Sequence, residues 1–81
     1  MAQTRGNRPL GAMDLRRVVG RNVRQMREAA GLSQEELAHR ASVHVTYLSG
    51  VENGRRNPTV LVVGRLALAL DTAAARLFDN Q

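Results

Sequence analysis

The sequence predicts a single all-α domain with five helices. Apolar residues recur every three or four positions through most of the chain, and residues that favour helix ends stand beside several of these segments. No segment alternates apolar and polar residues as a half-buried strand does. The length of 81 residues fits one domain with one core. We divide the chain into a flexible basic arm at residues 1–12 and a folded domain at residues 13–81.

The arm is rich in glycine, proline and arginine, with Gly6, Pro9 and Gly11 beside Arg5 and Arg8. This composition favours an unfolded segment. Two roles stay open for it: a contact with DNA phosphates or the minor groove, or a tail without a binding function.

The first helix is expected over residues 14–30. Asp14 favours its N-terminus, and Gly31 is placed to end it in a left-handed turn. Its apolar positions follow the helical period and form one stripe: Leu15, Val19, Val23, Met26 and Ala30.

The second helix is expected over residues 33–41 because its start carries two local signals. Ser33 and Glu36 have the spacing of a capping box, and Leu32 and Leu37 have the spacing of a hydrophobic staple.

Three further helices are expected over residues 44–53, 60–70 and 72–78. Gly54 ends the first of them, Pro58 blocks its continuation, and Thr59 caps the next. Apolar residues of three helices are expected to face the core. In the helix at residues 33–41 they are Leu37 and Ala41, and around the helix at residues 44–53 they are Val43, either Tyr47 or Leu48, and Val51. In the helix at residues 60–70 they are Val60, Val63, Leu66, Ala67 and Leu70.

The two helices within residues 33–54 have the spacing of a helix-turn-helix. Ala38 is small at the point where the two helices must cross closely. Ser42 occupies the turn, where glycine is the easiest residue because of its backbone freedom.

The segments VRQMREAAGLSQEELAHRASV and YLSGVENGRRNPTV resemble the phage-repressor-like helix-turn-helix family, the Cro/C1 or XRE type. The resemblance covers about residues 15–78. Within the family, the length and the segment TYLSGVENGRRN are most similar to the small controller proteins of restriction–modification systems.

The resemblance implies a DNA-binding transcription regulator and gives individual residues roles. In the family pattern Arg27 forms a structural ion pair with Glu52, in preference to a DNA contact. Tyr47 either donates its hydroxyl to a phosphate or fills a gap. The residues that the resemblance places at DNA phosphates are Gln34, Tyr47, Asn53, Arg55 and Arg56.

The helix at residues 44–53 is the expected recognition helix, whose first turn enters the major groove. Its expected base contacts are His44, Val45, Thr46 and Ser49. Relatives often carry Arg or Gln where this chain has Val45, which can only pack on a thymine methyl. Specificity therefore rests on DNA shape, or Arg55 and Arg56 reach bases instead.

The helix at residues 60–70 is apolar around almost its whole circumference. Its surplus apolar positions are Leu61, Val62, Leu68 and Ala69. Exposed apolar patches of this kind mark contact surfaces, so we expect a two-fold homodimer here. The alternative is that the helix at residues 72–78 and the N-terminal segment cover this face.

The composition narrows the function further. The formal net charge of +5 favours polyanions such as double-stranded DNA as partners. All twelve basic residues are arginine, but GC-rich coding also produces this bias, so it carries little weight. The absence of cysteine excludes disulfides and cysteine-based zinc sites. We expect a cytoplasmic protein that is not an enzyme, with no cofactor, metal site, small-molecule ligand or membrane span. The alternative function is an antitoxin or adaptor whose main partner is another protein.

Overall fold

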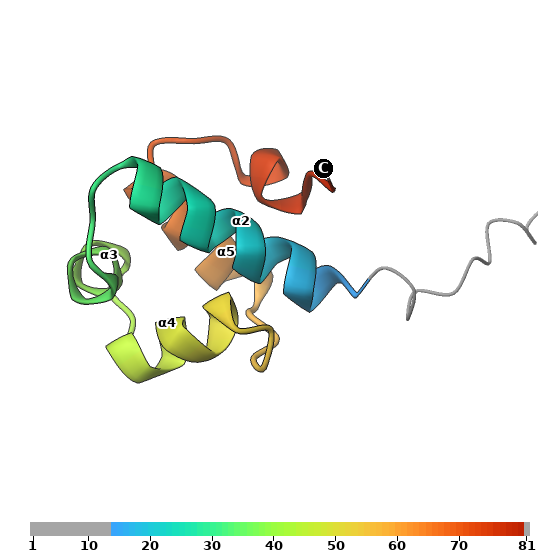
Figure 1. The fold of residues 1–81 in the computed structure, drawn as a ribbon, viewed down its shortest axis with the longest axis horizontal. Helices are drawn as coiled ribbons and strands as arrows, with labels where there is room; N and C mark the ends of the chain where they lie inside the picture. The colour runs from blue at the N-terminus through green and yellow to red at the C-terminus, as the bar shows by residue number, and fades with distance from the viewer. Residues whose placement is uncertain (1–13, 81) are drawn as a thin grey trace, which may run out of the picture.

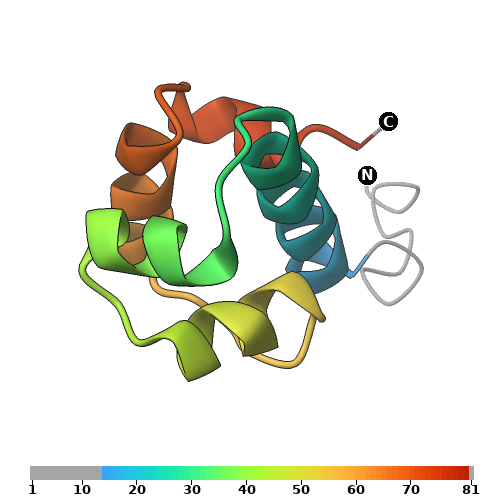
Figure 2. The same cartoon turned by 60° about the vertical axis from the view of Figure 1, so that its left-hand side comes forward.

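The computed structural model describes residues 14–80, which form four α-helices and one short 3-10 helix (Figure 1). Figure 2 shows α2 and α5 at opposite sides of the view, α3 between them, α4 along the base and η2 across the top. This part of the chain contains no strand, so the predicted all-α class is confirmed. The predicted arm lies outside the described residues. The elements in chain order are α2 (Leu15–Ala29), α3 (Gln34–Ala41), α4 (Val45–Glu52), α5 (Val60–Ala69) and η2 (Ala74–Phe78).

The prediction of five α-helices is wrong at its last element. The segment at residues 72–78 contains the five-residue 3-10 helix η2, in which the backbone N–H of Arg76 donates to the carbonyl of Ala73 at 3.0 Å. Asp71, with a φ of 57°, makes a left-handed turn just before it. So short a segment cannot sustain the hydrogen-bond ladder of an α-helix, and 3-10 bonding is common in such pieces. The other four helices begin and end within one residue of the prediction.

Every element contributes to one core. Val23, Leu37, Leu48, Leu66 and Leu77 are fully buried, and they come in turn from α2, α3, α4, α5 and η2. Burying each such side chain stabilises the fold by about 1.5–3 kcal/mol relative to leaving it in water. The core therefore holds α4 by its inner face and leaves its outer face to solvent.

Side-chain caps fix where the helices begin. Asp14, Ser33 and Thr59 each accept a hydrogen bond from a backbone N–H in the first turn of the helix that follows. At α3 the backbone N–H of Ser33 also donates to Glu36 Oε1 at 2.7 Å, which completes the capping box. This hydrogen bond lowers the pKa of Glu36, so the box is charged and intact at neutral pH. Ser42, in the turn to α4, has a φ of 59°, the left-handed conformation that favours glycine.

The ends of two predicted apolar stripes lie outside the core. Leu15 is 45% exposed and Val60 is 89% exposed, although their spacing places them with buried neighbours. Both are the first residue of a helix and lie at the edge of the domain. Ala30, after the end of α2, is also exposed, whereas Val18 is buried. The helical period identifies a face but not the point along it where the core stops.

A buried asparagine fastens the C-terminal segment to α2. Asn22 Nδ2 donates to the carbonyls of Leu77 and Asp79 at 2.9 and 2.8 Å. Asn22 is 1% exposed and occupies a position in the apolar stripe, three residues after Val19. Its amide thus provides hydrogen-bond donors for two carbonyls at the end of the short 3-10 segment.

Helix α2 contacts the end of α4 backbone to backbone at Gly20. A Cβ atom on Gly20 would collide with the carbonyl oxygen of Val51 and lie 3.0 Å from that of Glu52. Because any other residue carries this atom, the crossing requires glycine. The same contact sets the distance between α2 and the end of α4.

We expect Gly20→Ala to lower the free energy of unfolding by about 1–3 kcal/mol, because the added methyl group forces the two backbones apart. The matched control is Gly64→Ala in α5, where a Cβ atom meets nothing within 4 Å. That change should be neutral or stabilising by up to about 1 kcal/mol through helix propensity. Urea denaturation of both variants checks this. Equal stability of Gly20→Ala and the parent chain would contradict the close contact.

Candidate nucleic-acid interface

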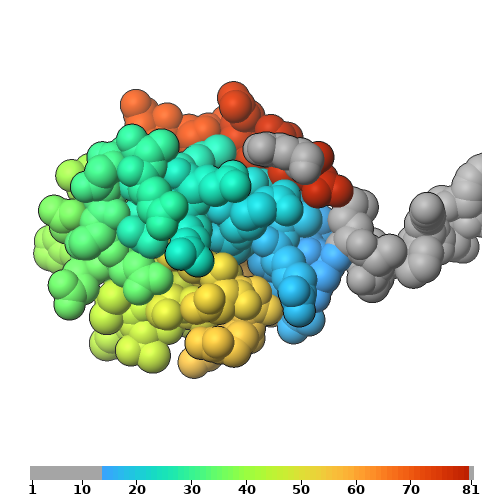
Figure 3. All heavy atoms as spheres, in the orientation of Figure 1, coloured from blue at the N-terminus to red at the C-terminus, as the bar shows by residue number. Residues whose placement is uncertain are grey.

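Helix α4 buries one face and presents the other to solvent. The space-filling view shows α4 and the loop after it along the lower edge of the molecule (Figure 3). The side chain of His44, the N-cap residue, makes no capping hydrogen bond. The outward-facing residues are His44, Val45 and Thr46, which are exposed, and Ser49, which is half-buried. An exposed first turn on a helix held by its other face is the arrangement that allows entry into the major groove.

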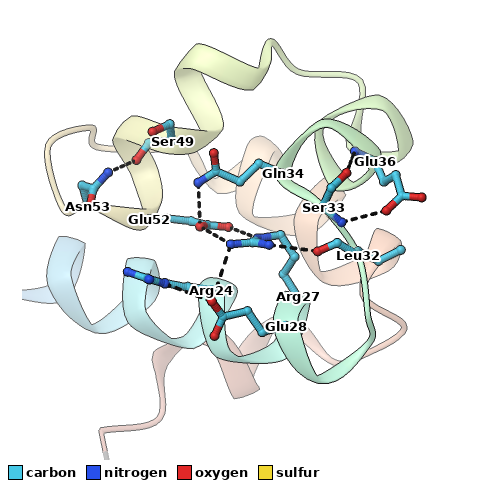
Figure 4. Close-up of polar contacts among 10 residues, drawn as sticks. All are labelled: Arg24, Arg27, Glu28, Leu32, Ser33, Gln34, Glu36, Ser49, Glu52 and Asn53. Atoms are coloured by element: carbon cyan, nitrogen blue, oxygen red, sulfur yellow. Dashed lines mark hydrogen bonds and ion pairs between the residues drawn. The ribbon is translucent and has the colours of Figure 1, made fainter.

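A buried ion pair fixes the far end of α4. Arg27 Nε donates to Glu52 Oε2 at 2.7 Å, and Arg27 Nη2 donates to Oε1 at 3.0 Å (Figure 4). The Glu52 side chain is 2% exposed and that of Arg27 is 12% exposed. The hydrogen bond to Glu52 raises the pKa of Arg27, which stays charged. Arg27 Nη1 also donates to the carbonyl of Leu32 at 2.9 Å, so this guanidinium lies inside the fold.

Gln34, the first residue of α3, also bonds to Glu52. Its Nε2 donates to Glu52 Oε1 at 2.9 Å, and Figure 4 shows the amide directed at the carboxylate. Nε2 carries two hydrogens, and this bond uses one of them. The side chain is half-buried, so the second hydrogen remains available to another acceptor. A single carboxylate thus orients residues from α2 and α3 against α4.

The loop after α4 folds back over the helix. The backbone N–H groups of Arg55 and Arg56 donate to the carbonyl of Gly50 at 2.8 and 3.3 Å. A Cβ atom on Gly50 would lie 2.6 Å from Arg56 Cγ, so the stem of Arg56 rests on the bare backbone of Gly50. The Arg56 guanidinium lies 5.5 Å from the centre of the half-buried Tyr47 ring. Both arginines are exposed beside the outer face of α4.

Two further predicted residues have backbone or packing roles in the structure. Asn53 is exposed, and its Nδ2 donates to the carbonyl of Ser49 at 2.8 Å, which closes the end of α4. Tyr47 packs against the core while it supports Arg56. The predicted base- and phosphate-contact residues therefore belong to α4, its N-cap or the loop after it, except Gln34 of α3, which bonds to Glu52.

Comparison with known families agrees with this geometry. A family model described as helix-turn-helix (HTH_3) matches residues 23–77, about two thirds of the chain. The chain belongs to the Cro/C1 (XRE)-type helix-turn-helix family. The likeness inferred from the sequence, including that to controller proteins, is confirmed.

Members of this helix-turn-helix family that resemble the chain cover most of its length. The control protein C.SmaI of Serratia marcescens is 39% identical over 69 residues, which are 85% of this chain and 82% of the relative. The restriction-modification controller protein C.AhdI from Aeromonas hydrophila superposes with a TM-score of 0.76 at 40% identity, covering 78% of this chain and 96% of that one. SinR, a master regulator for biofilm formation, was solved in complex with DNA and superposes with a TM-score of 0.72 at 32% identity, covering 75% and 98%. SinR is an HTH-type transcriptional regulator, and the other two are a control protein and a restriction-modification controller protein.

Two contacts of this helix-turn-helix domain were not predicted. The bond between Gln34 and Glu52 joins residues 18 positions apart, and no local spacing signals it. The contact of Arg56 with Gly50 was not predicted either. Its one signal in the sequence is a glycine in the interior of a helix, where glycine usually has a packing or functional reason.

Other kinds of site receive no support from the described residues. None of the helices within residues 14–80 combines the length and the apolar character needed to cross a bilayer. The same residues contain no group of three or more His, Cys, Asp or Glu side chains arranged for a metal ion.

We expect Glu52→Ala to lower the free energy of unfolding by about 3–5 kcal/mol, because it leaves a nearly buried Arg27 without its counter-ion. The double variant Arg27→Met/Glu52→Leu should recover most of this loss, since apolar side chains of similar size can replace a buried ion pair. Thermal and urea denaturation of both proteins provide the measurement. A cost below about 1 kcal/mol for Glu52→Ala would place the pair among weak surface ion pairs.

Proposed function

We propose that this chain is a sequence-specific transcription regulator that binds a palindromic DNA operator as a homodimer, in the role of a restriction–modification controller. The observation that carries the proposal is the exposed first turn of α4, on a helix fixed at its other end by the Glu52 ion pair and flanked by Arg55 and Arg56. Family membership supplies the class of partner, which is duplex DNA.

The proposed DNA contacts divide by chemistry. Arg55, Arg56 and Gln34 bind phosphates, which fixes the position of the domain without reading sequence. His44, Thr46 and Ser49 offer polar groups to base edges, and Val45 packs on a thymine methyl group. Arg56, which Tyr47 and Gly50 support beside the first turn of α4, is the long side chain best placed to reach a base as well.

The homodimer is proposed from the apolar face of α5. Leu61 is 66% exposed and Leu68 is 83% exposed, whereas Val62 and Ala69 are half-buried and pack against the core. The exposed surface continues through Val60 into a shallow apolar hollow between α2, α5 and η2. A second copy of the chain would cover this surface, and a two-fold axis would place the recognition helices about 34 Å apart. The residues that line the hollow include Leu15, Val19, Pro58, Val63 and Phe78.

Selection of bound sites from a pool of random duplexes tests the whole proposal. The expected result is one enriched motif with two-fold symmetry and half-sites about one helical turn apart. No enrichment, together with capture of a protein partner through the α5 face, would favour an antitoxin or adaptor. An enriched site without symmetry would remove the homodimer but leave the DNA-binding function.

We expect Arg55→Ala to weaken binding to all duplexes without changing their order of preference, because the side chain contacts a phosphate and not a base. The slope of log affinity against log salt should fall by about 0.9, since one phosphate fewer is neutralised. Arg55 is exposed and makes no ion pair within the described residues, so the melting temperature should not change. Arg76→Ala in η2, across the molecule from α4 in Figure 1, is the control. A changed preference at one base pair would instead make Arg55 a base-reading residue.

We expect Leu68→Asp to shift the protein toward monomer in sedimentation, because the new charge would be buried in the proposed interface. The side chain is exposed in the single chain, so the fold should persist. Gln25→Asp, at an exposed position of α2, adds the same single negative charge outside α5 and is the control. A dimer that survives Leu68→Asp would show that the subunits meet elsewhere.

A further inference from the structure

We infer that Arg17 and Arg21, on the first half of α2, form a second phosphate-binding strip that contacts the duplex beside the groove entered by α4. The inference rests on the proposed function. The two arginines are four residues apart, so they lie on one face of the helix. Both are exposed, and neither has an ion-pair or hydrogen-bond partner for its side chain within the described residues. The neighbouring Arg16 and Arg24 differ, because each pairs with an acidic side chain nearby.

The position of the strip follows from two glycines. Gly20 lets the backbone of α2 touch the last carbonyls of α4. Gly54, in the loop after α4, has a φ of 73°, and a Cβ atom there would lie 3.1 Å from Arg17 Cγ. The stem of Arg17 therefore lies against the loop that continues into Arg55 and Arg56. Figure 3 shows the start of α2 next to this loop, at the same lower edge as α4.

The chemistry of the strip fits the sugar–phosphate backbone. The strip continues from the arginines proposed to bind phosphate, and its guanidinium groups are free to form two hydrogen bonds each to an anionic oxygen. No acidic side chain pairs with them among residues 14–80, so their charge is available to an incoming anion. The strip would add a contact from α2 to the surface that α3 and α4 provide.

A purely structural role would give different behaviour. Arg17 lies close to the C-terminal end of α4, where a positive charge interacts favourably with the helix dipole. In that role its removal would lower stability and leave the salt dependence of DNA binding unchanged. If Arg17 binds phosphate, its removal should instead reduce the salt dependence of DNA binding and leave stability unchanged.

The test measures binding of the full chain to a labelled duplex pool of random sequence at several salt concentrations, because non-specific binding depends on phosphate contacts alone. We expect Arg17→Ala/Arg21→Ala to reduce the slope of log affinity against log salt by about 0.9 for each phosphate that is no longer neutralised, or about 1.8 per subunit. Arg17→Lys/Arg21→Lys keeps the charges and should keep the slope. Arg76→Ala should keep it too, since η2 lies across the molecule from α4.

The outcomes separate the two levels of inference. If the unmodified chain binds the duplex with no salt dependence, the proposed function fails. If it binds with a steep slope and the double alanine variant has the same slope, the strip alone is refuted. Should Arg17→Ala alter the melting temperature through its contact with Gly54, Arg21→Ala by itself decides the matter, with an expected reduction of about 0.9.

Discussion

The carboxylate of Glu52 is the group on which the position of α4 depends. It accepts two hydrogen bonds from Arg27 of α2 and one from Gln34 of α3, while it belongs to the last turn of α4. An ion pair this deeply buried adds little net stability, since desolvation offsets most of the attraction. Its contribution is orientation: three helices meet at one charge, so α4 can take only one position. A recognition helix needs this property because side chains that read bases must be held to within a fraction of an ångström.

Glycines around α4 provide the second constraint. Gly20 in α2 admits the backbone at the end of α4, Gly50 admits the stem of Arg56, and Gly54 admits the stem of Arg17. At Gly50 and Gly54 an arginine side chain occupies the space that a Cβ atom would take, whereas at Gly20 the carbonyl groups of Val51 and Glu52 occupy it. The stems of Arg56 and Arg17 therefore rest against backbone, which lowers the entropy that these two side chains lose when they bind a ligand.

The sequence predicts those parts of the structure that local geometry decides. The capping box at Ser33 and the cap at Thr59 predict where two helices begin, and the helical period predicts the buried leucines of α3 and α4. The period fails at Leu15 and Val60 because the edge of the core depends on which elements cover it. The form of η2 depends on the turn at Asp71, and its attachment depends on Asn22, 55 residues from Leu77. The contact of Gln34 with Glu52 likewise exists only after the helices have packed.

On the proposed surface, different residues bind phosphates and read bases, and this separation has a consequence for regulation. The arginines supply affinity that falls with salt and does not distinguish sequences, whereas the polar base-reading groups on each α4 are few. One subunit alone would therefore bind many sites with similar strength. In the proposed dimer, two subunits joined through α5 would add their small preferences, so the selectivity of the dimer would be roughly the square of that of the monomer. Because dimer formation depends on concentration, such a chain would gain selectivity as it accumulates. The exposed leucines of α5 would then be as necessary to recognition as the residues proposed to touch the bases.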